Sequence, residues 1–366
     1  MQTSSVKTLA IAVSIFFITS NLSGSFLPIY FRELGLNITQ ITEMLLFTFI
    51  VIGLLPLILL KWVKNFERIF SFGIFFTMLF FIVLMRFKDP IILGLAYGLS
   101  IATFWPSFNL LQFRLGESKV RARTVSLFSS IIPSLASIIG PAAGGFIIEN
   151  SNFTTLFAVA VILYLVAFIL SIQIKFKPET RRFSIPKNRL FVIFFLTFII
   201  LGFSETYWVA YPFFVHSISG TFFSMGLVLA ASAILISCVT FLVNWLSDIK
   251  GTRVSFAIVG TILNVVWYFV IGYASTMQEI VALSLLSGFA GAFTLSWFAY
   301  YGDSFGKEYY ASILVLMEVG LMIGRIINLA PTSIFIFEAN YIAYFALSGL
   351  VLICMIPFYF ASKRNR

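Results

Sequence analysis

Long apolar stretches, separated by short polar breaks, run along the whole chain. A membrane-spanning helix needs roughly 20 mostly apolar residues, and hydrophobic residues make up 60% of the 366 residues while charged ones make up 10%. A soluble domain of this length could not remove so much apolar surface from water. The sequence therefore predicts an all-α membrane protein with twelve transmembrane helices. The predicted helices are 8–31, 39–60, 69–85, 91–111, 124–149, 154–174, 190–215, 223–246, 254–274, 280–301, 311–336 and 341–361.

Basic residues are distributed unevenly between the breaks. Apart from Arg325, which lies inside a stretch, only Arg32, Arg86 and Lys88 fall on one side, and the other Lys and Arg residues fall on the opposite side. Because cytoplasmic loops carry the excess of basic residues, both termini are predicted to be cytoplasmic in a multi-pass protein of the plasma membrane. The net charge of +10 then reports topology and contact with anionic lipid headgroups, and we expect no nucleic-acid partner.

The longest break, 175–189, is basic and contains proline, and it divides the chain near its middle. The sequence predicts a six-helix bundle at 1–174, a cytoplasmic linker at 175–189 and a second six-helix bundle at 190–366. Breaks at corresponding places in the two halves share residues, 62–68 with 245–253 and 116–119 with 302–304. This internal similarity predicts two bundles related by pseudo-two-fold symmetry.

Three stretches resemble the major facilitator superfamily. Residues 244–253, NWLSDIKGTR, are similar to its cytoplasmic loop signature and keep Asp248, Gly251 and Arg253. Residues 117–123 resemble its charged turn between helices four and five, and 139–145, IGPAAGG, match the GPxxGG element that is prominent in drug–proton antiporters. The loop after helix two lacks the Asp and Gly of the signature, which leaves the subfamily open.

The resemblance implies a cytoplasmic gate. Asp248, beside Gly251 and Arg253, would bridge to Arg121 and Arg123 at the start of helix five, where charge pairing and the helix dipole both hold a carboxylate. The alternative is an ordinary solvated loop acid, since exposed ion pairs contribute little. In helix five, the immediate role expected of the glycine-proline element is a kink with close helix packing. Its residues are Gly140, Pro141, Gly144 and Gly145.

Four ionisable residues lie inside predicted spans. Glu205 in helix seven and Arg325 in helix eleven are at similar depth, Glu318 is seven residues before Arg325, and Glu43 is one turn into helix two. Such groups are costly in a membrane and normally face protein or a wet cavity. The resemblance implies that these helices line or flank the substrate pathway, which predicts coupling or substrate residues. A buried structural ion pair between Glu205 and Arg325 is the alternative.

Polar and aromatic residues are concentrated in helices one, four, seven and ten, which line the central cavity in the family. The candidates are Asn21, Trp105, Asn109, Tyr207, Trp208, Tyr211, Trp297 and Tyr300. Each aromatic residue, taken singly, is more often a packing or interfacial-belt residue than a ligand contact.

These features favour a secondary active transporter that moves a small solute by alternating access, coupled to protons. The sequence contains no phosphate-binding GxxxxGK[ST] loop, no GxSxG element and a single histidine with two cysteines, so we expect no enzyme activity, no cofactor and no metal. Two substrate classes remain open: aromatic residues and GPxxGG favour efflux of lipophilic compounds, whereas Arg325 favours a small organic anion. A non-transporting receptor or scaffold on the same fold is the alternative. We expect a monomer.

Overall fold

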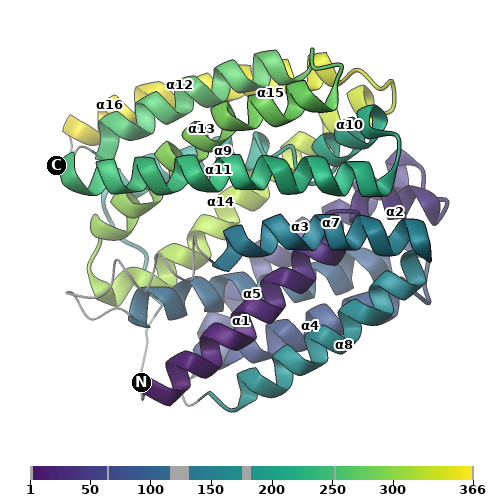
Figure 1. Cartoon of the computed structure of the whole chain (residues 1–366). Coiled ribbons are helices and arrows are strands. Elements are labelled where there is room, and N and C mark those ends of the chain that lie inside the picture. The colour runs from purple at the N-terminus through teal and green to yellow at the C-terminus, as the bar shows by residue number, and fades with distance from the viewer. Residues whose placement is uncertain (1–2, 64–65, 116–131, 175–182, 251–252, 365–366) are drawn as a thin grey trace. The chain divides into compact units, whose positions relative to one another are not determined.

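The computed structural model describes residues 3–63, 66–115, 132–174, 183–250 and 253–364, and these residues form helices and short connections (Figure 1). The first half contains α1 (Thr3–Gly24), α2 (Leu27–Glu33), α3 (Ile38–Trp62), α4 (Ile69–Leu84), α5 (Pro90–Leu115), α7 (Ile132–Asn150) and α8 (Phe153–Ile172). The second half contains α9 (Arg189–Phe203), α10 (Ala210–Ser219), α11 (Phe222–Lys250), α12 (Arg253–Ile271), α13 (Met277–Asp303), α14 (Tyr310–Pro331), the π-helical η4 (Thr332–Ile336), α15 (Tyr341–Ile353) and α16 (Met355–Arg364).

Nine helices in the described part of the chain are long and apolar enough to cross a membrane. Three shorter apolar helices accompany them, at Ile69–Leu84, Arg189–Phe203 and Met277–Ala290. Together they correspond to the twelve predicted spans, six in each half. The prediction of an all-α, multi-pass membrane protein is confirmed.

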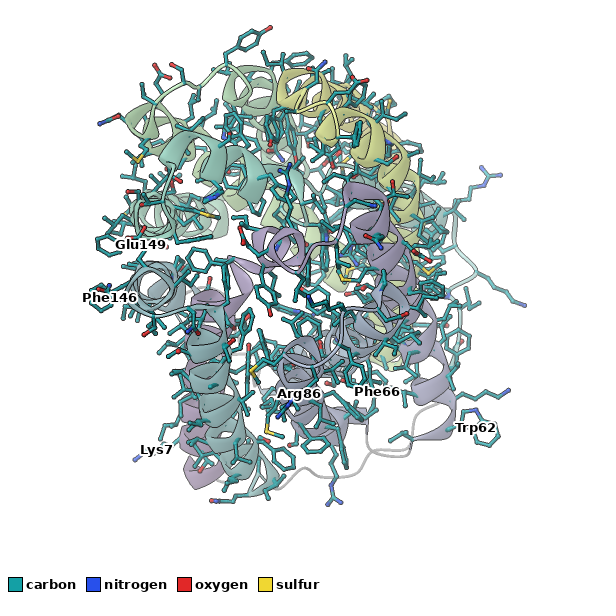
Figure 2. All side chains as sticks on the ribbon, turned by 90° about the vertical axis from the view of Figure 1, so that its right-hand side faces the viewer. Lys7, Trp62, Phe66, Arg86, Phe146 and Glu149 are labelled. Atoms are coloured by element: carbon teal, nitrogen blue, oxygen red, sulfur yellow. The ribbon has the colours of Figure 1, made fainter. Side chains whose placement is uncertain are left out.

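Exposed apolar side chains follow the lipid-facing surface that such a protein needs. On α8 they recur at Ile162, Leu165, Ile169 and Ile172, which is one face of a helix. At the end of α3, Trp62 is 77% exposed and its side chain projects away from the ribbon (Figure 2). An indole in this position suits the membrane interface, where aromatic side chains with one polar end are enriched.

The chain divides into two compact units. The first comprises Met1–Phe183 and Thr221–Ala230, and the second comprises Ser184–Gly220 and Ala231–Arg366. The change of unit after Phe183 falls inside the predicted linker, most of which, at 175–182, lies outside the described residues. The start of α11, within Thr221–Ala230, belongs to the first unit, whereas the sequence predicted all of 190–366 to lie in the second bundle.

The same helix pairings occur inside each unit. In the first, α7 and α8 pack against α1, while α5 and α8 pack against α4. In the second, α14, α15 and α16 pack against α9, while α13 and α15 pack against α12. In terms of the twelve spans, the first span packs against the fifth and sixth. The seventh span packs in the same way against the eleventh and twelfth. The internal similarity seen in the sequence therefore extends to the packing within each bundle.

Glycines allow the closest of these contacts. A Cβ atom added to Gly140 or Gly144 of α7 would collide with the backbone of α1 around Leu22. A Cβ added to Gly324 of α14 would likewise collide with the backbone of α9 at Ile199 and Phe203. Small residues four apart permit backbones to approach, which drives helix association in lipid.

Two predicted helices are interrupted, and this corrects the sequence reading. The predicted helix 8–31 ends at Gly24 and restarts at Leu27, and the predicted helix 190–215 ends at Phe203 and restarts at Ala210. In the first case Pro28 near the start of α2 lacks the N–H that a continuous helix needs. In the second, side chains of other helices bind the backbone of the interrupted segment, as described below.

The last two spans are also less regular than predicted. The predicted helix 311–336 changes to a π-helix at Thr332, directly after Pro331, and the predicted helix 341–361 is divided at Cys354 between α15 and α16. A proline removes one helical hydrogen bond, so its neighbours adopt another pattern.

Candidate functional site

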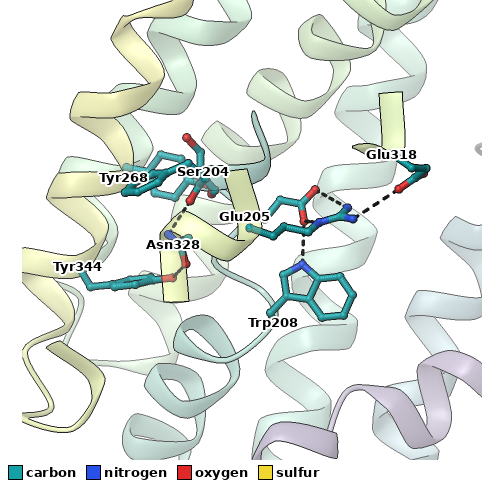
Figure 3. A network of polar contacts seen from close by, with 9 residues as sticks. Ser204, Glu205, Trp208, Tyr268, Glu318, Asn328 and Tyr344 are labelled. Atoms are coloured by element: carbon teal, nitrogen blue, oxygen red, sulfur yellow. Dashed lines mark hydrogen bonds and ion pairs between the residues drawn. The ribbon is translucent and has the colours of Figure 1, made fainter. Parts of the chain in front are cut away.

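Glu205 lies in the segment Ser204–Val209 that separates α9 from α10, and it forms a two-atom ion pair with Arg325 of α14 (Figure 3). The distances are 2.6 Å from Arg325 Nε to Glu205 Oε2 and 3.0 Å from Nη2 to Oε1. The indole Nε1 of Trp208 also donates to Glu205 Oε2, at 2.7 Å. Bidentate, charge-assisted contacts of this kind are among the stronger hydrogen bonds in proteins.

A second carboxylate reaches the same guanidinium. Arg325 Nη1 donates to Glu318 Oε2 at 3.4 Å, and the two side chains are each 8% exposed. Glu318 and Arg325 are seven residues apart on α14, so two helical turns bring them to one face. The structure brings Glu205, Glu318 and Arg325 together, and their expected role as coupling or substrate residues stays a prediction.

The three charges do not balance. With both carboxylates ionised, the cluster carries one more negative than positive charge. A buried charge without full compensation is costly, and such groups normally accept a proton or pair with a ligand.

The cation of Arg325 also lies near an aromatic pair. Its Cζ atom is 5.4 Å from the ring centre of Trp208, and Trp208 stacks on Tyr207 with centroids 5.4 Å apart. The Tyr207 residue is 54% exposed. Trp208 thus contacts both members of the ion pair, and Tyr207 interacts with Glu205 as well.

A neutral network holds the backbone just before Glu205. Asn328 Nδ2 donates to the carbonyl of Phe203 at 2.6 Å, and the Tyr268 hydroxyl donates to the carbonyl of Ser204. The hydroxyl of Tyr344 donates to Asn328 Oδ1 at 2.6 Å. These bonds satisfy two carbonyls at the end of α9, which in a membrane could not otherwise remain buried.

The predicted aromatic residues of helix ten lie in the interior of the second unit. Trp297 is 0% exposed, and its ring packs on Phe194 and Tyr359 while its Nε1 donates to Thr197 at 3.0 Å. Tyr300 is also buried and lies beside Phe194. In helix seven, Tyr211 is half-buried beside Trp267. None of these three is brought to the Glu205–Arg325 pair.

The candidates in the first unit are spread over several helices. Asn21 Nδ2 donates to Phe17 O at 2.9 Å and its Oδ1 accepts from Ser137 of α7 at 3.0 Å. Trp105 is partly exposed beside Phe17, and Asn109 is half-buried on α5. Glu43 is exposed on α3. These four residues belong to the first unit, whereas the members of the charged cluster all belong to the second.

Most residues of the predicted cytoplasmic gate lie outside the part of the chain that the structure describes. Arg121, Arg123 and Gly251 lie outside the described residues, and Asp248 and Arg253 lie in α11 and α12 with side chains that are not described. The bridge between them stays a prediction.

The helix-five element lies in α7, with Pro141 inside the helix. A Cβ on Gly145 would collide with the Phe222 carbonyl at the start of α11, and Glu149 Oε1 accepts from Phe223 N at 3.0 Å (Figure 2 labels Glu149). The element thus packs closely at its three glycines, and the kink expected of it stays a prediction.

Sequence reasoning missed the neutral network. Asn328, Tyr268 and Tyr344 were not among the predicted site residues, although Asn328 follows Arg325 by three positions on the same helix face. A polar residue at helical spacing from an intramembrane charge was the available signal. Tyr268 and Tyr344 carry no such signal, because only tertiary packing brings them to α9.

No group of three or more His, Cys, Asp or Glu side chains that could hold a metal occurs among the described residues.

Comparison with known families finds one match that extends along the chain. The model of the Major Facilitator Superfamily matches residues 9–189 and 193–366. Among curated proteins, the uncharacterized protein YqgE of Bacillus subtilis is 27% identical over 184 residues, which is 45% of this chain and 41% of YqgE. An uncharacterized protein encoded in the sodM 3′ region of Geobacillus stearothermophilus is 28% identical over 144 residues, 36% of this chain and 64% of that protein. The matched regions thus span less than two thirds of either relative.

Two solved transporter structures are similar over nearly their whole length. The crystal structure of the nucleoside transporter NupG has a TM-score of 0.71 at 13% identity and covers 99% of this chain and 100% of its own. The human organic anion transporter MFSD10 (TETRAN) has a TM-score of 0.67 at 12% identity, with coverage of 97% and 99%. At these identities the likeness establishes the shared fold.

Proposed function

Because this chain belongs to the major facilitator superfamily, we propose that it is a secondary active transporter that couples movement of a small solute to protons by alternating access. Its family and fold identify a multi-pass membrane transporter. Proton coupling is our addition, and it rests on the excess of one carboxylate in the Glu205–Arg325–Glu318 cluster.

Glu318 is the proton acceptor in this proposal. Glu205 accepts two hydrogen bonds from Arg325 and one from Trp208, all at 3.0 Å or less. Among the described residues, the Glu318 carboxylate receives a single contact from Arg325, at 3.4 Å. A carboxylate with fewer donors gains more from protonation. Glu205 then serves as the fixed counterion, and Glu318 takes up and releases the proton.

The charge balance favours a small organic anion as the substrate. Protonation of Glu318 removes its hold on Arg325 Nη1, and a guanidinium binds carboxylate and phosphate groups well. One anion and one proton together leave the net charge of the cluster unchanged. Co-transport of the two therefore requires no additional buried charge.

Lipophilic compounds are the second candidate substrate. The observation in their favour is the exposed ring of Tyr207, stacked on Trp208 beside the acids. An aromatic surface next to carboxylates suits a lipophilic molecule that is exchanged for a proton.

The remaining features of the proposal come from the charge pattern of the sequence, which gives the orientation, and from the family resemblance, which gives the cytoplasmic gate. We place the carrier in the plasma membrane as a monomer with both termini in the cytoplasm, with Asp248, Arg121 and Arg123 closing its cytoplasmic side. Membrane lipids surround it, and no nucleic acid takes part.

The test begins with a thermal-shift screen of the purified protein against organic acids, lipophilic drugs, nucleosides and sugars, since a ligand of the native state raises apparent stability. Flux of the compound with the largest shift is then measured in proteoliposomes with an imposed pH gradient. We expect the wild type to be gradient-driven and Glu318→Gln to exchange substrate without gradient-driven accumulation. Full gradient drive in Glu318→Gln would remove Glu318 from coupling, and absence of saturable flux with every compound would favour a receptor.

A further inference from the structure

The segment that carries Glu205 is bound through its backbone by residues outside the ion pair. At the end of α9, the N–H of Ser204 bonds back to Ile200 and Leu201, whereas the carbonyls of Phe203 and Ser204 accept from the side chains of Asn328 and Tyr268. In a spanning segment a carbonyl without a donor is costly, so these side chains stabilise the interruption of the helix.

The orientation of the Asn328 amide is fixed by two hydroxyl groups. Asn328 Oδ1 accepts from Tyr344 at 2.6 Å and from Thr332 Oγ1 at 3.0 Å. Because hydroxyl donors occupy the oxygen side, the NH₂ group faces the Phe203 carbonyl. All three side chains are buried, and a buried network with its partners satisfied holds a single geometry.

Asn328 and the ion pair connect the same two backbone segments. Asn328 is three residues after Arg325, which puts both side chains on one face of α14. Phe203, its partner, is two residues before Glu205. Gly324 lets the α14 backbone touch Ile199 and Phe203 of α9 directly. The position of the Phe203 carbonyl on Asn328 therefore sets where the chain presents the Glu205 carboxylate.

We infer that Asn328, oriented by Tyr344, is a positioning residue for the counterion Glu205: it fixes the end of α9 so that Glu205 meets Arg325 with both oxygens. Asn328 acts through Phe203 and has no contact with substrate in this account. The inference gives the site of the proposed function a second layer, and it rests on that function for its biological meaning. In structural terms, the Glu205–Arg325 ion pair depends on the hydrogen bond from Asn328 to the Phe203 carbonyl.

The prediction is that the Glu205–Arg325 interaction weakens when the Asn328 network is cut. The interaction is measured by a double-mutant cycle of Glu205→Gln, Arg325→Gln and both, with melting of the purified protein in detergent as the readout. The cycle is repeated in the backgrounds Asn328→Ala and Tyr344→Phe. A residue that only adds stability would lower all four melting temperatures together and leave the coupling between the two charges unchanged.

Tyr359→Phe supplies the matched control. Tyr359 is a buried tyrosine of the same unit, and its hydroxyl is 2.8 Å from Thr261 Oγ1, away from the α9–α10 interruption. Like Tyr344→Phe, the Tyr359→Phe substitution removes a tyrosine hydroxyl from a buried hydrogen bond. We expect the Glu205–Arg325 coupling to fall by about half or more in Asn328→Ala and Tyr344→Phe, since residues of one network couple strongly, and to stay at the wild-type value in Tyr359→Phe.

Coupling that is unchanged in both Asn328→Ala and Tyr344→Phe would overturn the inference, and so would an equal loss in Tyr359→Phe. If Asn328→Ala does not fold, the Tyr344→Phe background decides alone, because it keeps the amide and removes one donor. The cycle needs no transported substrate. Failure of proton-driven flux would therefore contradict the proposed function and leave this result readable.

Discussion

Two interrupted spans of this chain, α1–α2 and α9–α10, are the first spans of their halves, and they differ in what stabilises them. Around the first interruption, Ser25 Oγ donates to Asn21 O and Asn21 Nδ2 donates to Phe17 O, each four residues back on the same helix. Around the second, the donors are Tyr268 of α12 and Asn328 of α14. The first interruption is bonded locally, whereas the second depends on tertiary structure.

Each of these spans also has a corresponding partner. Helix α7 packs on α1 through Gly140 and Gly144, as α14 packs on α9 through Gly320 and Gly324. Across the first seam, Ser137 bonds to the amide of Asn21. Across the second, Arg325 pairs with Glu205. The comparison teaches that a common packing scheme carries a neutral contact in one half and a charged one in the other.

The largest expected effect separates these two polar contacts. Arg325→Met leaves the buried Glu318 and the part-buried Glu205 without a cation and should destabilise the protein by about 3–5 kcal/mol. The corresponding removal of the neutral contact, Asn21→Ala, should cost ~1 kcal/mol. Melting of both purified variants in detergent tests the difference. Equal losses would mean that the charged contact is no more critical to the fold than the neutral one.

The glycine seams should respond alike, because they are the shared part of the two halves. Gly140→Ala and Gly324→Ala each place a methyl group against the backbone of the neighbouring helix, which should cost about 1–3 kcal/mol through overpacking. The measurement is thermal melting of the purified variants together with their membrane yield. An effect confined to one seam would break the correspondence between them.

The smallest effect concerns the interruptions themselves. Tyr268→Phe removes the donor to the buried Ser204 carbonyl and should cost about 1–2 kcal/mol. Ser25→Ala removes a local bond beside a half-buried position and should change stability by less than ~0.5 kcal/mol. Matched unfolding curves would decide. A loss in Ser25→Ala as large as that in Tyr268→Phe would contradict local bonding of the first interruption.

The sequence predicted the spans and the charged residues because both follow from the cost of lipid. Glu205, Glu318 and Arg325 stand out as ionisable residues within apolar stretches, and the seven-residue spacing places the last two on one face. The interruption at Ser204–Val209 was not predictable in the same way. It depends on hydroxyl and amide groups of Tyr268 and Asn328, which approach α9 only once the bundle has packed.

The sequence also could not distinguish aromatic residues that line the transport pathway from those that pack in the interior of the bundle. Trp297 and Tyr207 both lie in spans expected to line the cavity, yet Trp297 is enclosed by Phe194 and Tyr359 while Tyr207 is exposed beside Trp208. In the sequence, each is an aromatic residue in a span expected to line the cavity, so the sequence does not distinguish the packed residue from the exposed one. Which face of each helix meets its neighbours is set by packing across the bundle.

The central claim is that the charged contact of the second half serves transport, and one variant tests it most directly. Glu205→Gln combined with Arg325→Gln removes one negative and one positive charge, so the net charge of the cluster is unchanged, and Glu318, which loses its contact with Arg325, can take up a proton. Removal of both partners of a buried ion pair is often nearly neutral for stability. Membrane yield, melting temperature and pH-driven proteoliposome flux of the compound found by thermal shift are measured together. The account predicts a protein with near-normal yield and melting temperature and little flux. Normal flux in this double variant would contradict it and leave Glu205 and Arg325 as structural partners.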